Sequence, residues 1–506
     1  MGRPDCDSVA IKSGRIAALG RSAELRKLTS PETRLVDLNG ATVAPGFIDC
    51  HLHFLEAASV AAGLDLSGET SLARMLDLLR DYASGAPPGE WVKAFGCDEA
   101  QTVEGRGPSR DELDRAVPRN PLRLRHQTLH ASWLNSRGIE ALGLATGAAA
   151  LPAGARALRD LNGNLSGLVV GMEEWLSRRI PRVSLDDLEA RARTFSSALA
   201  RAGVTSFTDA GAGNGMEELR LFAGLARVGA IRQRIGMMIG AEHLEEAIRA
   251  GLSTREEMVA LRGVKFMPAP IVRARSGKQA DEPTRELWIS WAERAQRMGL
   301  PCAFHATEVE ELETALGVIE GVQSRVGATT LSGPDKAATL RFRIEHASLI
   351  PPNYLERLLA CGAWVVSNPG FLYFRGRKYA AEPGLLPYLF PLRSLVDAGV
   401  PVAAGTDAPV TPTRPLAAIC AAATRRDIRG EELCTRQALS VEEALSLFTT
   451  RAAQLSGSGG GELAQGKAAD LVVLDANPLD VQPEKLRHLR VRMTIVGGEV
   501  IYEQPR

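Results

Sequence analysis

Four histidines in this sequence stand at the ends of short apolar runs, where side chains from different strands can meet. The chain has only 8 histidines in 506 residues. His51 and His53 form the H-x-H pair of GFIDCHLHF, while His305 and His346 close the runs CAFHA and RIEHA. Because alternate side chains of a strand point to one face, His51 and His53 can share a cation at about 2.0–2.1 Å from each nitrogen. A lone histidine of this kind is usually a hydrogen-bonded core residue, but four at strand ends favour a metal site.

An aspartate and a lysine extend this set. Asp407 ends the run VAAGTD, just before Pro409. Lys265 lies in GVKFM, where burial and a neighbouring cation would lower its pKa and leave a neutral amine. Such an amine can take up carbon dioxide, and the resulting carbamate would bridge two cations; the alternative is an ion pair between the lysine and a carboxylate. The predicted metal ligands are His51, His53, Lys265, His305, His346 and Asp407.

Two charged residues beside His346 are not expected to take part in the chemistry. In RFRIEHA, regular alternation directs Arg343 and Glu345 away from the face of His346 and toward the helix layer. A structural ion pair between them is the simpler interpretation.

Eight runs of strand type, each followed by a helix-like segment, would position the candidate ligands. The runs are residues 46–54, 203–211, 231–240, 263–270, 301–306, 341–347, 361–369 and 401–407. A strand followed by a helix, eight times over, predicts an α/β protein with a closed (β/α)8 TIM barrel. The carboxyl ends of barrel strands meet at one rim, so the candidate ligands would converge there.

The spacing of the candidates agrees with barrel repeats and indicates one insertion. Lys265, His305 and His346 follow one another at intervals of 40 and 41 residues, and the 61 residues to Asp407 cover two units. The first and second strands are much farther apart, so about 100 extra residues must be inserted between them, roughly at 66–190. We expect this insertion to shape the substrate site.

Both ends of the chain are expected to form one small β-sandwich. Residues 8–43 and 460–503 show period-two alternation with glycine turns. The first strand of such a sheet would precede Asp7, so either this edge strand is missing or the natural chain starts earlier. The predicted domains are residues 1–43 and 457–506 for the sandwich and residues 44–456 for the barrel with its insertion.

Composition narrows the class of partner. The 60 Lys and Arg residues balance 60 Asp and Glu residues, so we expect no charged surface for nucleic acid or an anionic membrane. No uncharged apolar run reaches the roughly 18 residues that span a bilayer. The seven scattered cysteines are expected to be reduced thiols. A cytoplasmic protein with a small-molecule substrate is the simple interpretation, and a homo-oligomer is left open.

The chain resembles the amidohydrolase superfamily, and within it the branch that includes N-substituted formamide deformylase. The matching stretches are APGFIDCHLH (44–53), RHQTLHASWLNSRGIEALG (125–143), GVKF (263–266), FHA (304–306), RIEHA (343–347), GTDAPV (405–410) and QGKAADLVVLD (465–475). They lie in the right order over essentially the whole chain. The resemblance implies a barrel flanked by a small β-sandwich, with one or two cations at the barrel mouth, zinc or another divalent metal.

The resemblance also implies how the ligands divide. His51, His53 and Asp407 would hold the more buried metal. An N6-carboxylated Lys265 would bridge it to a second metal, which His305 and His346 would hold.

The insertion carries a further candidate. The branch has a histidine in an H-x-x-W/V-x-N-S stretch, which His130 matches here, and it would contact the substrate or polarise its carbonyl group. Asn135 in the same stretch would hold the loop together.

Two stretches depart from the branch. Met267–Pro270 stands where the branch usually has aspartate-glycine-serine, and Ala306–Val309 stands where it usually has isoleucine-glycine-aspartate. The formamide specificity is therefore not transferred.

These residues predict a metal-dependent hydrolase that cleaves an amide, formyl amide or cyclic amide bond of a small molecule. A water bound to the metal has its pKa lowered to about 7, so a metal-bound hydroxide would attack the carbonyl carbon. Asp407 would take the proton of the water and pass it to the departing nitrogen. The alternatives are a metal-dependent decarboxylase or other lyase at the same site and, less favoured, a non-catalytic small-molecule binder.

Overall fold

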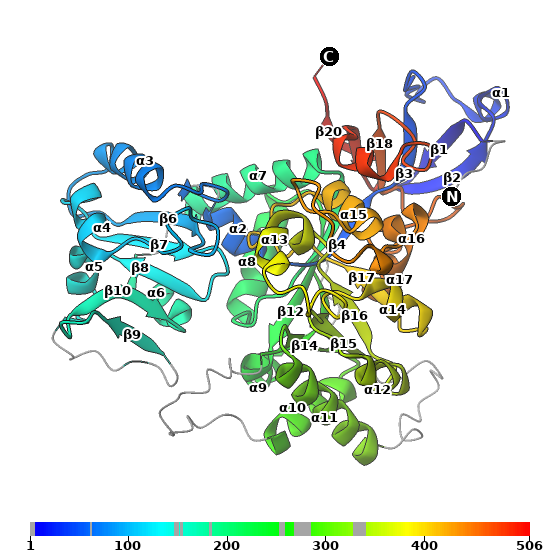
Figure 1. The fold of residues 1–506 in the computed structure, drawn as a ribbon. Coiled ribbons are helices and arrows are strands. Elements are labelled where there is room, and N and C mark those ends of the chain that lie inside the picture. Colours follow the sequence, from blue (N-terminus) through cyan, green and yellow to red (C-terminus); the bar gives the residue numbers. More distant parts are fainter. Residues whose placement is uncertain are drawn as a thin grey trace. The chain divides into compact units, whose positions relative to one another are not determined.

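The computed structural model of the chain describes residues 6–60, 63–145, 151, 155–181, 185–251, 259–267, 285–326 and 341–505. The chain divides into two units (Figure 1). The insertion unit holds the described residues from Phe54 to Phe195, and the barrel unit holds the others.

Eight parallel strands form one sheet among the described residues of the barrel unit, in the order β17-β16-β15-β14-β13-β12-β11-β4. Each predicted run overlaps one of them, which confirms the α/β barrel; β13 begins at Val259, before the start of the fourth run. Residues 268–270 of the fourth run lie outside the described residues. The strands are β4 (Phe47–Leu52), β11 (Val204–Asp209), β12 (Arg234–Gly240), β13 (Val259–Phe266), β14 (Cys302–Ala306), β15 (Phe342–His346), β16 (Trp364–Ser367) and β17 (Val402–Ala404).

The first and last strands of the barrel meet at their carboxyl ends. The backbone N–H of Asp407 donates to the carbonyl of His51 at 2.7 Å, and that of His53 donates to the carbonyl of Ala408 at 2.8 Å. Gly405 permits this approach, because a Cβ atom there would lie 2.5 Å from the backbone nitrogen of His51. We call this contact the β4–β17 seam.

The two faces of the barrel strands carry different residues. Ile48 and Cys50 of β4 pack against Ala452 of the covering helix α17 (Thr450–Ser456). Because neighbouring residues of a strand point to opposite faces, Asp49 and His51 point into the barrel. Both are completely buried.

The helices of the barrel unit are amphipathic where they cover the strands. In α10, for example, Trp288, Ile289, Ala292 and Ala295 are buried, a spacing that places them on one helical face. The helices are α7 (Leu185–Arg201, shared with the insertion unit), α8 (Met216–Arg227), α9 (Leu244–Arg249), α10 (Arg285–Arg297), α11 (Val309–Val326), α12 (Leu355–Ala360), α13 (Gly370–Ala380), α14 (Leu392–Asp397), α15 (Pro415–Thr424), α16 (Val441–Ser446) and α17, with short 3-10 turns at Ala241–His243, Pro352–Tyr354 and Thr435–Gln437.

The two ends of the chain form additional sheets in the barrel unit. An antiparallel sheet has the order β20-β19-β18-β3, and β1 pairs with β2. Ile16 of β2 packs with Ala469 and Leu471, so the N-terminal hairpin lies on the C-terminal segment. The elements are β1 (Ser8–Lys12), β2 (Arg15–Gly20), α1 (Ser22–Leu25), β3 (Thr42–Pro45), β18 (Leu471–Leu474), β19 (Val491–Val496) and β20 (Glu499–Glu503), with 3-10 turns at Arg26–Leu28 and Pro483–His488.

The insertion unit has its own sheet, in the order β5-β6-β7-β8-β10-β9. It extends from Phe54 to Phe195 and so includes the predicted insertion, roughly 66–190. Leu72, Met75 and Leu79 lie one helical turn apart on α3 and pack on Leu122 and Leu124 of β7. The strands are β5 (Leu64–Asp65), β6 (Val92–Cys97), β7 (Leu122–His126), β8 (Ala131–Leu134), β9 (Arg156–Arg159) and β10 (Leu165–Val170), and the helices are α2 (Phe54–Val60), α3 (Leu72–Ser84), α4 (Arg110–Ala116), α5 (Ser136–Ala141) and α6 (Glu173–Arg179).

Asn135 holds its loop together, as predicted. The completely buried side chain caps α5, because its Oδ1 accepts the N–H of Gly138 at 2.8 Å and that of Leu122 at 2.9 Å. Its Nδ2 donates to the carbonyls of Val117 and Asn120. Every polar atom of the amide is therefore used for structure.

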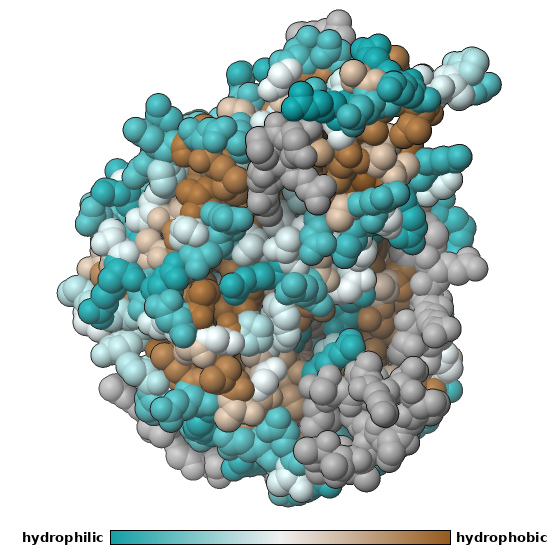
Figure 2. All heavy atoms as spheres, turned by 90° about the vertical axis from the view of Figure 1, so that its right-hand side faces the viewer, coloured by the Kyte–Doolittle hydropathy of each residue, from teal (hydrophilic) through white to brown (hydrophobic). Residues whose placement is uncertain are grey.

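The surface of the described residues carries both hydrophilic and hydrophobic side chains. On the face shown in Figure 2, hydrophilic residues are interspersed with smaller hydrophobic areas. Among the described residues, none of the helices has both the length and the apolar character needed to cross a bilayer. All seven cysteines are free, as predicted, and burial raises the pKa of the Cys50 and Cys302 thiols to about 12.

Candidate metal centre

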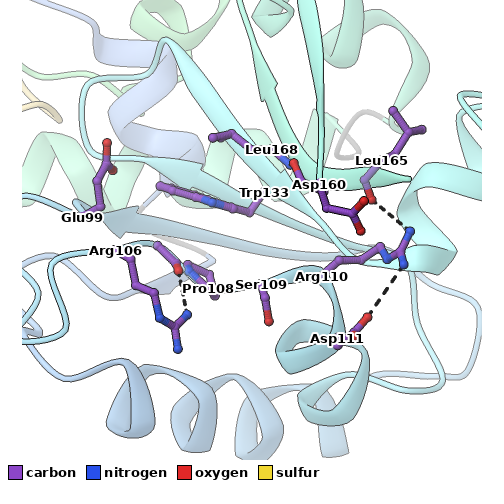
Figure 3. A pocket seen from close by; sticks show the side chains of 12 residues that line it. Glu99, Arg106, Pro108, Ser109, Arg110, Asp111, Trp133, Asp160, Leu165 and Leu168 are labelled. Atoms are coloured by element: carbon purple, nitrogen blue, oxygen red, sulfur yellow. Dashed lines mark hydrogen bonds and ion pairs between the residues drawn. The ribbon is translucent and has the colours of Figure 1, made fainter. Parts of the chain in front are cut away.

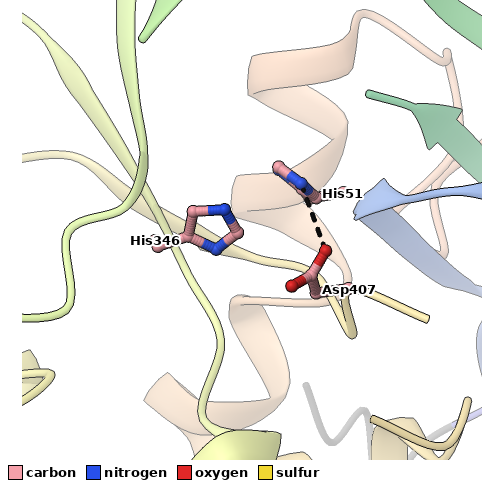
Figure 4. A group of neighbouring side chains, drawn as sticks. All are labelled: His51, His346 and Asp407. Carbon is pink, nitrogen blue, oxygen red and sulfur yellow. Dashed lines mark ion pairs between the residues drawn. The ribbon is translucent and has the colours of Figure 1, made fainter. Parts of the chain in front are cut away.

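Three of the predicted ligands converge at the carboxyl ends of the barrel strands. His51 lies on β4, His346 ends β15, and Asp407 follows β17 at the β4–β17 seam. Figure 4 shows the three side chains turned toward one another, and their ligand atoms all lie within 4.8 Å of one another. Two donors on one cation, each at about 2.0–2.2 Å, can be at most about 4.4 Å apart, so this group is close to the spacing that a shared ion requires.

The other predicted ligands adjoin this group. The Nε2 atom of His53 lies 3.1 Å from Oδ1 of Asp407, and Nε2 of His51 lies 3.4 Å from the same oxygen. The ring centroid of His305 is 4.6 Å from that of His346. Lys265, at the end of β13, is 2% exposed, and the charges of Glu345 and Asp407 act on its ammonium group. The structure therefore brings the four histidines and Asp407 together, with Lys265 buried on a neighbouring strand of the same barrel.

Hydrogen bonds fix which nitrogen of two histidine rings carries the proton. Nδ1 of His51 contacts a carboxylate oxygen of Glu345, which can only accept when it is ionised. Nδ1 of His346 lies 2.7 Å from Oδ1 of Asn368, and the amide is oriented by donation from its Nδ2 to the carbonyl of Gly405 at 2.9 Å. Both rings therefore carry hydrogen on Nδ1, and each Nε2 keeps its lone pair.

The donor atoms fit a divalent cation. Nε2 of His51 and Oδ1 of Asp407 are buried and have no hydrogen-bond partner among the described residues. Two lone pairs that face each other repel, and an unsatisfied buried polar atom costs about 1–3 kcal/mol. Imidazole nitrogen and carboxylate oxygen are ligands that zinc accepts, so a cation between these atoms would remove both penalties.

Burial and neighbouring charges shift the pKa values of the site. Burial lowers the pKa of His346 to about 3, so its ring is neutral and able to donate its lone pair. Burial alone would raise the pKa of Asp407, but the contact with His53, whose Nε2 lies 3.1 Å away, opposes this, and the pKa is held well below its ordinary value. Asp407 is therefore ionised at neutral pH.

The pKa of Lys265 is shifted in the predicted direction, toward that of a more readily deprotonated amine. Burial lowers its pKa to about 8, although the charges of Glu345 and Asp407 oppose the shift. Its Nζ atom is buried and has no hydrogen-bond partner in the part of the chain that the structure describes. The alternative of an ion pair with a carboxylate does not occur among those residues.

The predicted orientation of Arg343 and Glu345 is wrong. Both residues point into the barrel, where Glu345 contacts His51 and Arg343 donates to the carbonyl of Cys50 at 2.9 Å. They do form the predicted ion pair. The reason is the backbone of His346, whose φ of 66° interrupts the alternation, so that Glu345 and His346 both reach the interior.

Sequence reasoning missed Asn368 and Asp49. Asn368 directly follows β16, and its place at a strand end before Pro369 was the signal that could have found it. Asp49 shares the inward face of β4 with His51, two residues away. Its Oδ1 accepts the N–H groups of Thr406 at 3.0 Å and His51 at 3.2 Å, which ties the two strands together at the seam. Burial raises the pKa of Asp49 to about 6.

An aromatic side chain lies beside the centre. The ring of Phe371, on α13, is 6.5 Å from that of His346 in an edge-to-face arrangement, and it stacks on Phe390. This gives the centre one apolar neighbour.

The remaining candidate, His130, belongs to the insertion unit. Its side chain is exposed, and its carbonyl accepts the N–H of Gly171 at 3.0 Å. Its contact with a substrate stays a prediction.

The insertion unit also contains a second group of potential metal ligands, Asp98, Glu99 and His126. Nε2 of His126 lies 3.1 Å from Glu99, while Nδ1 accepts the N–H of Thr128 at 2.9 Å. Since Nδ1 is the acceptor, the hydrogen of the neutral ring is on Nε2 and points to Glu99. This histidine therefore has no free lone pair for a metal.

A pocket of about 380 Å³ lies beside this group (Figure 3). Its lining includes Glu99, Trp133 and the two arginines Arg106 and Arg110. Arg106 is paired with Glu112 through two contacts of 2.8 Å. The pocket contains none of the predicted metal ligands, so it is not the site of the metal chemistry.

Comparisons with known proteins agree with this geometry. The model of the amidohydrolase family Amidohydro_3 matches residues 34–502. N-substituted formamide deformylase of Arthrobacter pascens is 27% identical over 528 residues, which cover 98% of this chain and 95% of the relative. The matched range includes all the predicted ligands.

Solved structures share the fold. An uncharacterized metal-dependent hydrolase from Pyrococcus horikoshii OT3 superposes with a TM-score of 0.72 at 24% identity and covers 94% of each chain. Atrazine chlorohydrolase TrzN from Arthrobacter aurescens TC1, solved in complex with zinc, has a TM-score of 0.56 at 16% identity, with 98% of this chain and 90% of that chain covered.

Proposed function

The chain belongs to the amidohydrolase family, and from that premise we propose that it hydrolyses an amide, formyl amide or cyclic amide of a small molecule at the barrel-mouth centre. Family members are hydrolases, and this one is an enzyme acting on carbon–nitrogen bonds other than peptide bonds. The observation that carries the proposal is the convergence of His51 Nε2 and Asp407 Oδ1, both buried and unsatisfied, beside the neutral ring of His346.

We assign the metal ligands as follows. His51, His53 and Asp407 would hold one cation, and His305 and His346 would hold a second. Lys265, as an N6-carboxylated side chain, would bridge the two; its burial and its pKa of about 8 support this role. Nitrogen and oxygen donors favour zinc, although other divalent metals share this preference in part. A single ion on the shared group of His51, His346 and Asp407 is the simpler variant.

The protein residues divide the chemical work. When bound, the metal would lower the pKa of a water and polarise the carbonyl group of the substrate. Asp407, ionised and in contact with two histidines, would accept the proton of that water and deliver it to the departing nitrogen. Asn368 and Glu345 hold the rings that orient the centre.

A substrate panel tests the proposed reaction. Zinc-loaded protein is expected to release amine, ammonia or formate from at least one N-acyl, N-formyl or cyclic amide compound, with no release of carbon dioxide. The products are measured by mass spectrometry and by an enzymatic formate assay, with metal-free protein as the control. Carbon dioxide release without any amine would instead indicate the alternative, a lyase at the same centre.

The panel should not be limited to formamides. The departures at Met267–Pro270 and Ala306–Val309 change residues next to two of the ligands, and only Met267 of the first stretch lies within the described residues. The aromatic ring of Phe371 next to His346 favours compounds with an apolar group near the scissile bond.

Carboxylation of Lys265 has its own test. In protein supplied with ¹³C-labelled carbon dioxide at constant dissolved concentration, a carbamate carbon signal is expected in the NMR spectrum. It should grow as the pH rises from about one unit below to about one unit above the pKa of about 8, because only the deprotonated amine reacts. Lys265→Met should lack the signal. A signal of equal size in that variant would show that another amine reacts.

Two expectations from the sequence stay predictions: the cytoplasmic location and the contact of His130 with substrate. The formation of a homo-oligomer stays open.

A further inference from the structure

We propose that Glu345, held by Arg343, is a positioning residue that keeps the ring hydrogen of His51 on Nδ1 and so makes its Nε2 ready to bind a metal. The proposal rests on the proposed function, because it assigns His51 to the metal centre.

The contact between Glu345 and His51 spans the barrel interior. The two residues are 294 positions apart, on β15 and β4, and these strands are not neighbours in the sheet. Both side chains are completely buried. The carboxylate therefore meets the ring away from solvent, and the opposite ring nitrogen faces Asp407.

Arg343 fixes the carboxylate in place. Its guanidinium contacts both oxygens of Glu345, through Nε to Oε1 and through Nη2 to Oε2, the latter at 2.9 Å. The same Nη2 donates to the carbonyl of Cys50, the residue before His51, at 2.9 Å. One arginine thus holds the acceptor of the His51 ring and the backbone that carries this ring.

A purely structural role explains this pair less well. A buried ion pair gains little stability over apolar side chains of similar size, because both charges lose their hydration. Inward positions of barrel strands are usually filled by branched apolar residues. The carboxylate does, however, give His51 a charge-assisted hydrogen bond. This bond fixes the orientation of the ring and makes Nε2 a stronger metal ligand.

The two histidines of the centre differ in this respect. The corresponding acceptor of His346 is Oδ1 of Asn368, which is neutral. Of these two rings, only that of His51 has a charged acceptor, the carboxylate of Glu345, at its Nδ1 atom. We therefore expect the charge at position 345 to matter for the tautomer of His51.

The substitution Glu345→Gln makes a sharp test, because it keeps the shape of the side chain. The single N–H of Arg343 Nε needs an oxygen in front of it, whereas Nη2 also donates to the carbonyl of Cys50; the amide would therefore place its NH2 at the Oε2 position, toward Nδ1 of His51. Nδ1 would then have to accept, and the ring hydrogen would move to Nε2, where it blocks metal binding. A change of Asp to Asn beside a catalytic histidine acts in the same way in serine proteases.

The first measurement is the ¹⁵N NMR spectrum of the imidazole nitrogens in metal-free protein at a single pH near neutrality. The signals of His51 are assigned by their loss in His51→Gln. We expect hydrogen on Nδ1 in the unaltered protein and on Nε2 in Glu345→Gln. Hydrogen on Nε2 of His51 in the unaltered protein would overturn the proposal, even if Glu345→Gln does not fold.

The second measurement is zinc affinity, determined by competition with a chelator. Glu345→Gln is expected to bind zinc about 10- to 100-fold more weakly. The double variant Arg343→Met/Glu345→Gln should recover part of this loss, because the amide oxygen is then free to face His51. An unchanged tautomer and an unchanged zinc affinity in Glu345→Gln would overturn the proposal.

A matched control separates these effects from general destabilisation. Asp470, 3% exposed at the side chain, pairs with Arg234 at 2.6 and 2.9 Å in the same unit, away from the metal centre. Asp470→Asn also removes a buried carboxylate from an arginine, and it should leave the His51 tautomer and the zinc affinity unchanged. A change as large as that in Glu345→Gln would show that any such loss perturbs the site, and would contradict the proposal.

These readouts do not depend on catalysis. If no compound of the substrate panel is hydrolysed, the proposed function fails while the tautomer and zinc results can still support the role of Glu345. If amides are hydrolysed but the tautomer is the opposite one, the positioning role alone is refuted.

Discussion

Asp407→Asn is expected to lower kcat by roughly 10²- to 10⁴-fold, the range that general acid–base groups contribute, with little change in KM. Oδ1 of Asp407 lies 3.4 Å from Nε2 of His51 and 3.1 Å from Nε2 of His53, and its lowered pKa keeps the carboxylate ionised at neutral pH, which is the form that can take up a proton. An asparagine amide has a similar shape and can still present an oxygen to a metal, but it cannot take up the proton.

Metal content decides how this result is interpreted. The zinc bound per chain is measured in the same samples, and it should remain largely unchanged. Asp427→Asn is a suitable control, because Asp427 is a buried aspartate of the barrel unit that accepts N–H groups of its own loop. Full turnover by Asp407→Asn with metal bound would refute the role of Asp407 as the base.

Removal of the metal is expected to abolish turnover and to lower the thermal stability. Without a cation, the lone pairs of His51 Nε2 and Asp407 Oδ1 face each other in a buried space. A ligand that binds only the folded state adds about 2.7 kcal/mol at a concentration 100 times its Kd. Chelator-treated protein should therefore unfold at a lower temperature, and added zinc should restore both the stability and the activity.

The control for this experiment is His346→Ala, which removes one of the three converging ligands. In this variant, added zinc should raise the unfolding temperature much less. Turnover that persists in protein shown to be free of metal would contradict the metal-dependent function.

The barrel could be predicted because its signals are local. Each strand is a short apolar run with its own turn residues, so eight strands can be recognised without knowing how they pair. The ligands followed from the same pattern, because His51, His305 and His346 all lie at the carboxyl ends of such runs. The barrel geometry then brings these ends together.

What could not be predicted depends on backbone geometry and on contacts between distant residues. Alternation gave the wrong side for Glu345 because His346 has a left-handed φ, which no local pattern reveals for a residue other than glycine. Asn368 was missed because its importance lies in the ring it contacts, 22 residues earlier in the chain. The sheet of the insertion unit mixes parallel and antiparallel pairs, which short runs do not specify.

The β4–β17 seam has a consequence for the order in which the protein matures. The H-x-H pair is made early during synthesis, but its partner Asp407 is added only after some 350 further residues. A growing chain that stops before β17 carries five of the six predicted ligands but lacks Asp407, so it cannot hold the ion with the full donor set. Tight zinc binding would therefore occur only after β17 has joined β4 and the barrel is complete.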